Sequence, residues 1–271
     1  LIVNGNHVPT TPTRTTPISM ESNKTSNFPT LTRPDLIDYC PASNLAFNEK
    51  IKVWQKNGQT VYHFGFGQAP FPVVDCMTRA LREHAGENAY LPVAGIPELR
   101  EAVCGLHERY DNLTGLHPEQ VIVGPGTKEL IFLLLNVYYG DVMVISPTWT
   151  TYKPQSQLAH HKAYTVHTNL ENGWKITPQD VEQTIADNEL TGNKLLIMCN
   201  PDNPTGTCYT GPELKALSAV FRKHNVIVLS DEIYGRLHYT QEHVTLATYY
   251  PEGTVLSAGF SKWASAGGWR V

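Results

Sequence analysis

Four short runs of almost uninterrupted apolar residues constrain the fold of this chain more than any other feature. They lie at Val142–Ile145, Leu195–Met198, Val226–Leu229 and Val255–Ala258. A strand with one face in water alternates apolar and polar residues, whereas a near-continuous apolar run is typical of a strand covered on both faces. The runs therefore predict an α/β fold in which a mostly parallel sheet lies between two layers of helices.

Helical patterns lie before and between these runs. In two segments apolar residues recur at intervals of three and four positions, which predicts one apolar stripe along each of two helices. The stripes are Leu99, Val103, Leu106 and Tyr110, and Leu214, Leu217, Val220 and Phe221. Proline is common in the first turn of a helix, so Pro72 and Pro97 indicate where two helices begin.

Three of the apolar runs end close to a polar residue. Asn203 comes after the second run, Asp231 closes the third and Lys262 follows the fourth, so that the three residues are 28 and 31 positions apart. In open α/β sheets, ligands bind beyond the carboxyl ends of the strands. The spacing therefore predicts that three different polar groups meet in one crevice.

Each of these groups suits one part of a pyridine aldehyde cofactor. A lysine amine at the end of a buried strand is partly desolvated, which lowers its pKa toward the neutral, nucleophilic form. An aspartate can pair with a protonated pyridine nitrogen, and an asparagine amide can donate a hydrogen bond to a phenolate oxygen. Taken singly, an exposed lysine, a helix-capping aspartate and a turn asparagine are ordinary alternatives, and only their order and spacing favour a site.

A turn that suits phosphate precedes these three residues. Gly124–Leu130, with the sequence Gly-Pro-Gly-Thr-Lys-Glu-Leu, follows a short apolar run and opens a helical stretch at Glu129–Tyr138. Free amides at a helix N-terminus bind phosphate, and glycine lets the backbone approach it closely. The segment does not match a P-loop, because the Gly-Lys-Ser/Thr ending is absent. A plain turn is the alternative.

Together these motifs, in this order, resemble the class I aminotransferases, which are pyridoxal-phosphate enzymes of fold type I, and the aspartate-aminotransferase-like branch in particular. The resemblance runs from about Asp35 to Val271. It implies a three-layer large domain with a mostly parallel sheet, at residues 86–271, and an N-terminal segment at 35–85 that contributes to a small domain. Residues 1–34 are rich in Thr, Pro, Ser and Asn, and we expect a disordered extension there.

The resemblance implies roles at the cofactor ring for five residues. Lys262 would be the Schiff-base lysine and the general acid and base. Asp231 would hold the ring nitrogen protonated, and Tyr234 would be a catalytic residue that, with Asn203, hydrogen-bonds the phenolate oxygen. Trp149, in Ser-Pro-Thr-Trp, would stack on the ring.

The resemblance also implies a phosphate site. Gly126, Thr127 and Lys128 would form a cup for the phosphate, and Ser261 would add a further ligand. Arg270 would bind the phosphate as well, since the planar guanidinium donates two parallel hydrogen bonds.

Two further segments concern the substrate and a second subunit. Tyr90 resembles the tyrosine that reaches the phosphate of the neighbouring subunit, which implies a homodimer with shared active sites. Gly67 resembles a glycine near the α-carboxylate of the substrate, and Trp149 and Asn203 would also contact the substrate. The chain departs from the family pattern at Gly259, where many relatives carry a hydroxyl, and at Ala266–Gly267, where aspartate-type relatives often have Met-Thr.

The implied reaction is transamination between an L-amino acid of aspartate, alanine or aromatic type and a 2-oxo acid, with pyridoxal 5′-phosphate as cofactor. Another fold type I reaction, such as β-elimination or a cyclising synthase reaction, and a truncated non-catalytic homologue are the alternatives. Family members continue past the position of Val271 into a C-terminal small domain, which supplies an arginine for the α-carboxylate. We therefore expect residues 1–271 alone to bind the cofactor weakly and to lack activity.

Composition excludes several other classes. A net charge of −4 and a pI near 6.3 give no basic surface for nucleic acid or acidic membranes. The longest apolar stretch, around 130–139, is too short to span a bilayer. The five cysteines form no CxxC pairs or metal-ligand pattern, so we expect no metal, and reduced thiols in a cytoplasmic protein. A targeting role for the N-terminal extension stays open.

Overall fold

The computed structural model describes residues 33–36, 43–65, 67–239 and 242–271. By its contacts the chain divides into two units, Leu1–Pro41 and Ala42–Val271. The described part of the first unit contains one 3-10 turn at Pro34–Leu36. The predicted disordered extension at 1–34 therefore lies almost wholly outside the described residues, and the predicted boundary at 85 stays a prediction.

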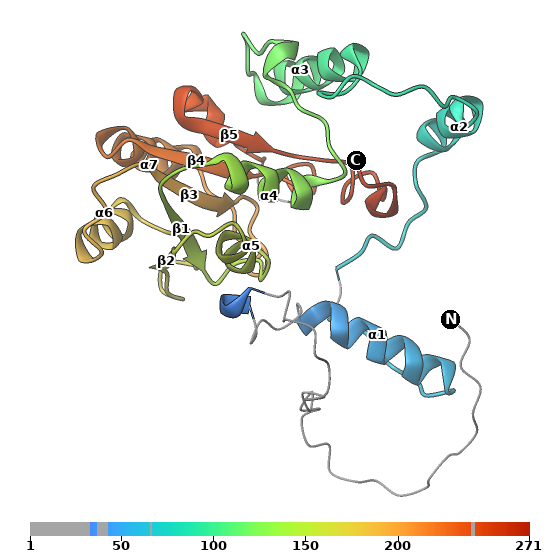
Figure 1. Cartoon of the computed structure of the whole chain (residues 1–271), viewed down its shortest axis with the longest axis horizontal. Coiled ribbons are helices and arrows are strands. Elements are labelled where there is room, and N and C mark those ends of the chain that lie inside the picture. The colour runs from blue at the N-terminus through green and yellow to red at the C-terminus, as the bar shows by residue number, and fades with distance from the viewer. Residues whose placement is uncertain (1–32, 37–42, 66, 240–241) are drawn as a thin grey trace, which may run out of the picture. The chain divides into compact units, whose positions relative to one another are not determined.

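The second unit contains a five-stranded sheet in which every neighbouring pair is parallel, in the order β2-β1-β3-β4-β5 (Figure 1). The strands are β1 (Asp141–Ser146), β2 (Ala163–His167), β3 (Lys194–Cys199), β4 (Val226–Asp231) and β5 (Thr254–Ser257). The four apolar runs form β1, β3, β4 and β5, which confirms the predicted parallel sheet. The strand β2 was not predicted from the sequence, because this edge strand buries only Val166 fully and has no continuous apolar run.

Seven α-helices are described, with short 3-10 turns in the connections. The helices are α1 (Ser43–Lys56), α2 (Asp75–His84), α3 (Pro97–Asp111), α4 (Thr127–Val137), α5 (Tyr152–Leu158), α6 (Pro178–Asp187) and α7 (Gly211–Lys223). Pro97 begins α3 as predicted. The prediction at Pro72 was wrong, since α2 begins at Asp75 after three extended residues. Among the described residues, none of these helices has the length and apolar character needed to cross a membrane.

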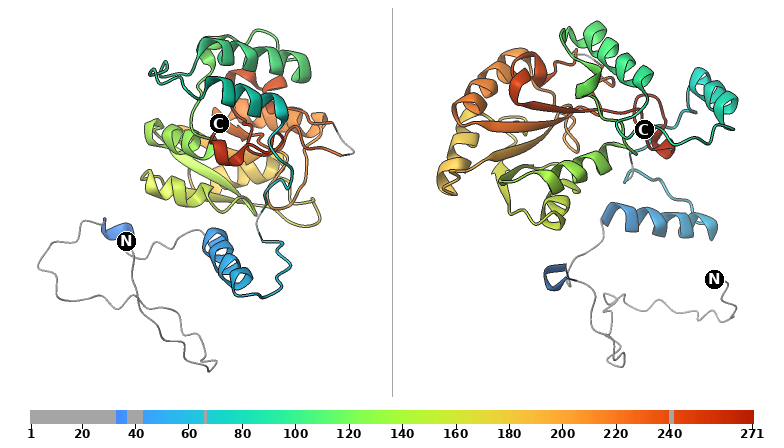
Figure 2. Two further views of the ribbon diagram at one scale, coloured as in Figure 1. Left: turned by 90° about the vertical axis from the view of Figure 1, so that its right-hand side faces the viewer. Right: turned by 45° about the horizontal axis from the view of Figure 1, so that its top comes forward.

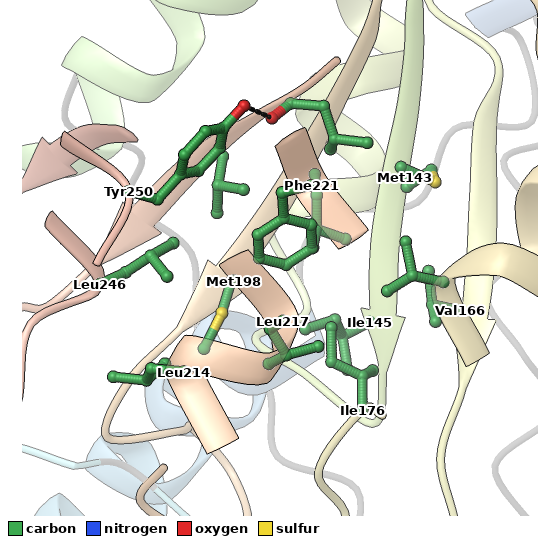
Figure 3. Close-up of a cluster of buried hydrophobic side chains, with 14 of the residues drawn as sticks. Met143, Ile145, Val166, Ile176, Met198, Leu214, Leu217, Phe221, Leu246 and Tyr250 are labelled. Carbon is green, nitrogen blue, oxygen red and sulfur yellow. Dashed lines mark hydrogen bonds between the residues drawn. The ribbon is translucent and has the colours of Figure 1, made fainter. Parts of the chain in front are cut away.

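Helices cover both faces of the sheet (Figure 2). On one face, side chains from α6 and α7 pack against strand residues such as Met143, Ile145 and Met198, which Figure 3 shows. On the other face, α4 and α5 pack against strand residues such as Leu195 and Ile197. Adjacent strand residues thus face opposite layers, which explains why almost every position of these strands is apolar.

The two predicted helical stripes differ in how fully they are covered. In α7, Leu214, Leu217 and Phe221 are buried against the sheet. In α3, the stripe is only partly covered, and Tyr110 is 61% exposed. Periodicity gives the direction of an apolar stripe along a helix, but the depth of burial depends on which elements lie against it.

The start of α7 is fixed by its own sequence. The carboxylate of Glu213 accepts hydrogen bonds from the backbone amide of Thr210, at 2.7 Å, and from its hydroxyl, at 2.8 Å. Pro212 occupies the first turn, where its missing amide costs nothing. Basic residues in the last turn complement the helix dipole. The helix therefore presents its apolar face to the sheet in one register.

Phe221 tests this packing. Its side chain is fully buried, and its ring centroid lies 6.1 Å from that of Tyr250. We expect Phe221→Ala to lower the free energy of unfolding by about 3–5 kcal/mol, because the cavity left behind adds to the lost burial. Chemical denaturation measures this change, with the exposed Lys215→Ala on the same helix as control. A loss below about 1 kcal/mol would contradict the described core.

The topology brings the predicted polar groups to one edge of the sheet. Cys199, Asp231 and Ser257 are paired across β3, β4 and β5 at the carboxyl ends of these strands. Asn203 and Lys262 follow within five residues of β3 and β5. Parallel strands place their carboxyl ends at the same edge, so the three polar groups that the spacing predicted to meet follow strand ends at one edge.

Candidate active site

Asp231, the last residue of β4, is the most buried charged group of the site. It is 2% exposed, and its carboxylate accepts hydrogen bonds from the Tyr152 hydroxyl, at 2.7 Å, and from the backbone amide of Ile233, at 3.3 Å. Burial raises the pKa of Asp231 to about 6, and the hydrogen bond from Tyr152 opposes the rise. A cationic partner next to such a buried carboxyl would stabilise its ionised form and so lower its pKa.

Tyr152 holds Asp231 and was not predicted from the sequence. It is the first residue of α5 and is fully buried beneath the sheet edge. Burial raises the pKa of its hydroxyl well above the usual value, as does the neighbouring Asp231. The hydroxyl therefore stays protonated and donates a hydrogen bond to Asp231. Tyr152 lies three residues after Trp149, within a segment already singled out, but only the fold brings it to a strand 79 residues away.

Lys262 lies in the turn that follows β5. Its Nζ donates a hydrogen bond to the carbonyl of Gly67, at 2.9 Å, and lies 5.5 Å from the ring centroid of Tyr234. Partial burial lowers the pKa of the Lys262 amine, while the charge of Asp231 opposes that change. The shift has the direction that a nucleophilic amine needs.

Tyr234 and Asn203 lie together beside Asp231. The side-chain amide of Asn203 donates to the Tyr234 hydroxyl at 3.3 Å. Burial raises the pKa of Tyr234 to about 12, so its hydroxyl keeps a proton that it can donate to a ligand. The two side chains come from the ends of β4 and β3, and they converge as the sequence predicted.

A second group of residues surrounds the start of α4. Gly126 precedes this helix with φ at 89°, a conformation that favours glycine, and a Cβ there would overlap the guanidinium of Arg270. Arg270 donates to the carbonyls of Pro125, at 3.2 Å, and Gly267, at 2.7 Å. The chain therefore places a guanidinium against free amides at a helix N-terminus, a combination that suits a phosphate.

The remaining predicted residues lie around these two groups, apart from Tyr90. Thr127 is the first residue of α4, and Ser261 immediately precedes Lys262. The Nζ of Lys128 lies 5.8 Å from the ring centroid of Trp149.

Trp149 and Tyr90 differ sharply in their surroundings. The ring of Trp149 packs edge-on against Tyr152, with centroids 5.3 Å apart and planes at 85°. It therefore lies next to the Tyr152–Asp231 contact. Tyr90 is fully exposed, and the structure does not bring it to the site of its own chain. The predicted contribution of Tyr90 to a neighbouring subunit stays a prediction.

The raised pKa of Asp231 has a consequence for stability that can be measured. The folded protein binds the proton of this carboxyl more tightly than the unfolded chain, whose aspartates have a pKa of about 3.9. Its contribution to the free energy of unfolding therefore falls as pH rises from about 4 to about 6 and stays constant above that range. Asp231→Asn removes the ionisation.

We therefore expect Asp231→Asn to stabilise the cofactor-free protein at pH 7.5 by up to about 3 kcal/mol, and by much less at pH 4.5. Denaturant titrations at the two pH values measure the difference, with the exposed Asp187→Asn as control. Equal effects of Asp231→Asn at both pH values would show that burial does not disfavour the charge.

Comparisons with known proteins agree with this geometry. The family model described as aminotransferase class I and II matches residues 59–271. The aspartate aminotransferase of Geobacillus stearothermophilus is 36% identical over 242 residues, which cover 85% of this chain and 60% of that relative. The aspartate/prephenate aminotransferase of Thermus thermophilus is 32% identical over 236 residues, with the same coverage.

Solved structures give the same result. The aspartate aminotransferase from Thermus thermophilus with maleate has a TM-score of 0.80 and 32% identity, over 85% of this chain and 60% of that one. The chain thus spans about 60% of the length of these relatives. Enzymes of this family depend on pyridoxal phosphate. With most of its length matched by the family model, this chain belongs to the class I and II aminotransferases.

Proposed function

We propose that this chain forms the cofactor-binding part of an enzyme that transfers the amino group of an L-amino acid to a 2-oxo acid. The observation that carries the proposal is the meeting of a buried carboxylate, a partly desolvated lysine and a guanidinium beside a helix N-terminus at one sheet edge. These groups are Asp231, Lys262 and Arg270. Each suits a different part of pyridoxal phosphate.

The residues present fit this cofactor. When bound, pyridoxal phosphate supplies an aldehyde that amines attack and a ring that withdraws electrons from the substrate. The α4 N-terminus and Arg270 hold the phosphate, where the close approach at Gly126 leaves no room for a side chain. Asp231 keeps a proton on the ring nitrogen, since a cation at that point favours the ionised carboxylate.

The other side chains orient the ring and move protons. Tyr234 and Asn203, whose side chains meet, would donate hydrogen bonds to the phenolate oxygen, and Trp149, which packs against Tyr152, would lie beside the ring. Lys262 attaches to the aldehyde. Once an amino acid has displaced it, its free amine would act as a general base at the α-carbon of the substrate and then as a general acid at the C4′ carbon of the cofactor.

An amino acid of aspartate type is the substrate that we favour. The two relatives described above are named aspartate aminotransferase and aspartate/prephenate aminotransferase, and one solved relative carries maleate, a dicarboxylate. Alanine and aromatic amino acids are the other candidates, because Ala266–Gly267 departs from the aspartate-type pattern. Gly67, whose carbonyl contacts Lys262, lies where a substrate carboxylate would approach.

We also propose a homodimer that shares its active sites. Tyr90 lies in a region rich in exposed apolar side chains, and such surfaces mark interaction sites. Tyr62, Phe64, Phe71, Tyr90, Leu91 and Val93 are each at least 69% exposed. In the dimer the partner subunit's Tyr90 would reach the phosphate.

A cytoplasmic setting agrees with the free thiols of Cys76, Cys104, Cys199 and Cys208 among the described residues.

Product analysis separates this proposal from other reactions on the same fold. Transamination yields one 2-oxo acid for each cofactor that becomes aminated, whereas β-elimination releases ammonia and leaves the cofactor unchanged. Single-turnover experiments on the full-length protein loaded with pyridoxal phosphate measure both products with two substrates. Aspartate tests transamination, and cysteine, whose thiol is a leaving group on the β carbon, tests elimination. Ammonia in place of aminated cofactor would favour an eliminating enzyme, and the absence of cofactor binding would favour a non-catalytic homologue.

The covalent link gives a prediction about one residue. We expect borohydride reduction of the loaded protein to attach a pyridoxyl group to Lys262, because its amine is partly desolvated at the sheet edge. Peptide mapping by mass spectrometry locates the label. Lys262→Arg keeps the charge and serves as control, and it should abolish the labelled peptide. Label on Lys128, the other lysine near the site, would refute the assignment.

The ring-nitrogen role of Asp231 gives a kinetic prediction. In the full-length protein, we expect Asp231→Ala to lower kcat and kcat/KM together by at least about a hundredfold, the scale for loss of one electrostatic contact to developing charge. Cofactor affinity should fall much less, because the phosphate contacts remain. Tyr152→Phe is the matched control: it removes only the hydrogen bond to Asp231 and should cause a smaller loss. Near-normal turnover in Asp231→Ala would exclude the role.

A further inference from the structure

Glu232, the residue after Asp231, is buried within a dense set of hydrogen bonds. Its Oε1 accepts from the hydroxyls of Ser230, at 2.8 Å, and Thr245, at 2.9 Å. The same oxygen accepts from the backbone amide of Leu246, at 3.3 Å. The Oε2 lies 2.6 Å from Nε2 of His243, which therefore carries the proton of that contact. Both oxygens of the carboxylate are thus fully engaged.

These contacts lie on the far side of the strand from the cofactor site. Ser230 and Glu232 bond to each other, whereas Asp231 between them points to Tyr152. Side chains alternate along a strand, so Glu232 faces away from the ring that Asp231 would meet. Glu232 therefore influences the site in two ways only. Its backbone positions the turn, and its charge acts on the neighbouring Asp231.

The backbone around Glu232 is the turn that presents Asp231 and Tyr234. The amide of Glu232 donates to the carbonyl of Ser257 on β5, at 2.8 Å, and its carbonyl accepts from Gly235, at 2.8 Å. The side chain adds a link from this turn to residues 243–246, which follow it in the chain. The turn is thus held by its main chain and, through one carboxylate, by a separate loop.

General stability is a poor explanation for this arrangement. The Glu232 and His243 side chains are 5% and 4% exposed, and removing two such groups from water is costly. Nδ1 of His243 is buried and has no hydrogen-bond partner among the described residues. The Glu232 charge also raises the pKa of Asp231, which works against the ionised form that a pyridinium needs. A cost of this kind is more typical of functional sites than of cores.

We propose that Glu232 and His243 form a positioning pair, which fixes the Ser230–Tyr234 turn so that the Asp231 carboxylate and the Tyr234 hydroxyl meet the cofactor ring. The proposal rests on the proposed function and adds two residues to it. Neither residue touches the cofactor. The pair holds the turn against the loop at 243–246, and its hydrogen bonds keep the Glu232 charge directed away from Asp231.

Other charged groups border the pair and Asp231. A cavity of about 40 Å³ lies beside His243 and is also lined by His107, Asp111 and Arg236. Asp111 accepts from His107, at 2.7 Å, and from Arg236, at 2.6 Å, so that α3 holds the same turn from another side. Asp231 itself has four titratable neighbours on the other side, which are Tyr152, Cys199, Tyr234 and Lys262.

The test compares Glu232→Ala with Glu213→Ala in protein loaded with pyridoxal phosphate labelled with ¹⁵N in its ring. Glu213 is a matched control, because its carboxylate also accepts from a threonine hydroxyl and a backbone amide but lies at the start of α7. The ¹⁵N chemical shift reports protonation of the ring nitrogen, equilibrium dialysis reports cofactor affinity, and the midpoint of thermal unfolding reports stability.

We expect both alanine variants to lower the midpoint, but only Glu232→Ala to shift the ¹⁵N signal toward the unprotonated ring and to weaken cofactor binding about tenfold, the scale for loss of an outer-shell partner. Glu232→Gln retains an acceptor oxygen and should restore most of the protonated signal. If Glu232→Ala does not fold, His243→Ala leaves the other three contacts in place and should give a smaller shift in the same direction.

Two negative outcomes are distinct. A fully protonated ring in Glu232→Ala and His243→Ala, with cofactor affinity equal to that of Glu213→Ala, would show that the pair only stabilises the fold, while the proposed function would stand. Failure of the full-length protein without substitutions to bind the labelled cofactor would overturn the proposed function, and the positioning role with it.

Discussion

The hydrogen bond from Tyr152 to Asp231 is the contact on which the rest of the site depends. It joins the first residue of α5 to the last residue of β4, with both side chains almost completely buried. A carboxylate at that depth needs donors, because an unpaired buried charge is far more costly than a paired one. The position of α5, and of Trp149 before it, is therefore coupled to the strand that presents Asp231.

The site as a whole works against the stability of the protein without its cofactor. Burial disfavours the charge on Asp231 and on Lys262, and Glu232 adds a second carboxylate next to the first. These costs are offset by a dense layer of hydrogen bonds behind the strand ends and by the continuous apolar faces of the sheet. A pyridinium next to Asp231 would offset the cost of burying the charge of that carboxylate. Cofactor binding is therefore coupled to the stability of the turn.

The parts of the site that sequence analysis found are those whose chemistry is local. Gly126 before a helix, Asp231 at the end of an apolar run and Lys262 after the next run each carry a pattern within a few residues. Tyr152 and the Glu232–His243 pair carry none. A buried tyrosine, glutamate or histidine has the same local pattern as an exposed one, and the partners of Tyr152 and His243 lie 79 and 11 residues away. The edge strand β2 was missed for another reason, since Thr165 and His167 interrupt its apolar residues and leave no continuous run.

The sequence by itself determined the parallel sheet, four of its five strands, the helical stripe from Leu214 to Phe221 and the family of the chain. It could do so because apolar runs, helical periodicity and caps act over a few residues, within reach of a linear pattern. The tertiary structure alone decided which hydroxyl meets Asp231, how Arg270 lies against Gly126, and which loop holds the turn at Glu232. Those contacts arise from the packing of elements that are distant in sequence, where burial changes the pKa of a side chain and the cost of leaving it without a partner.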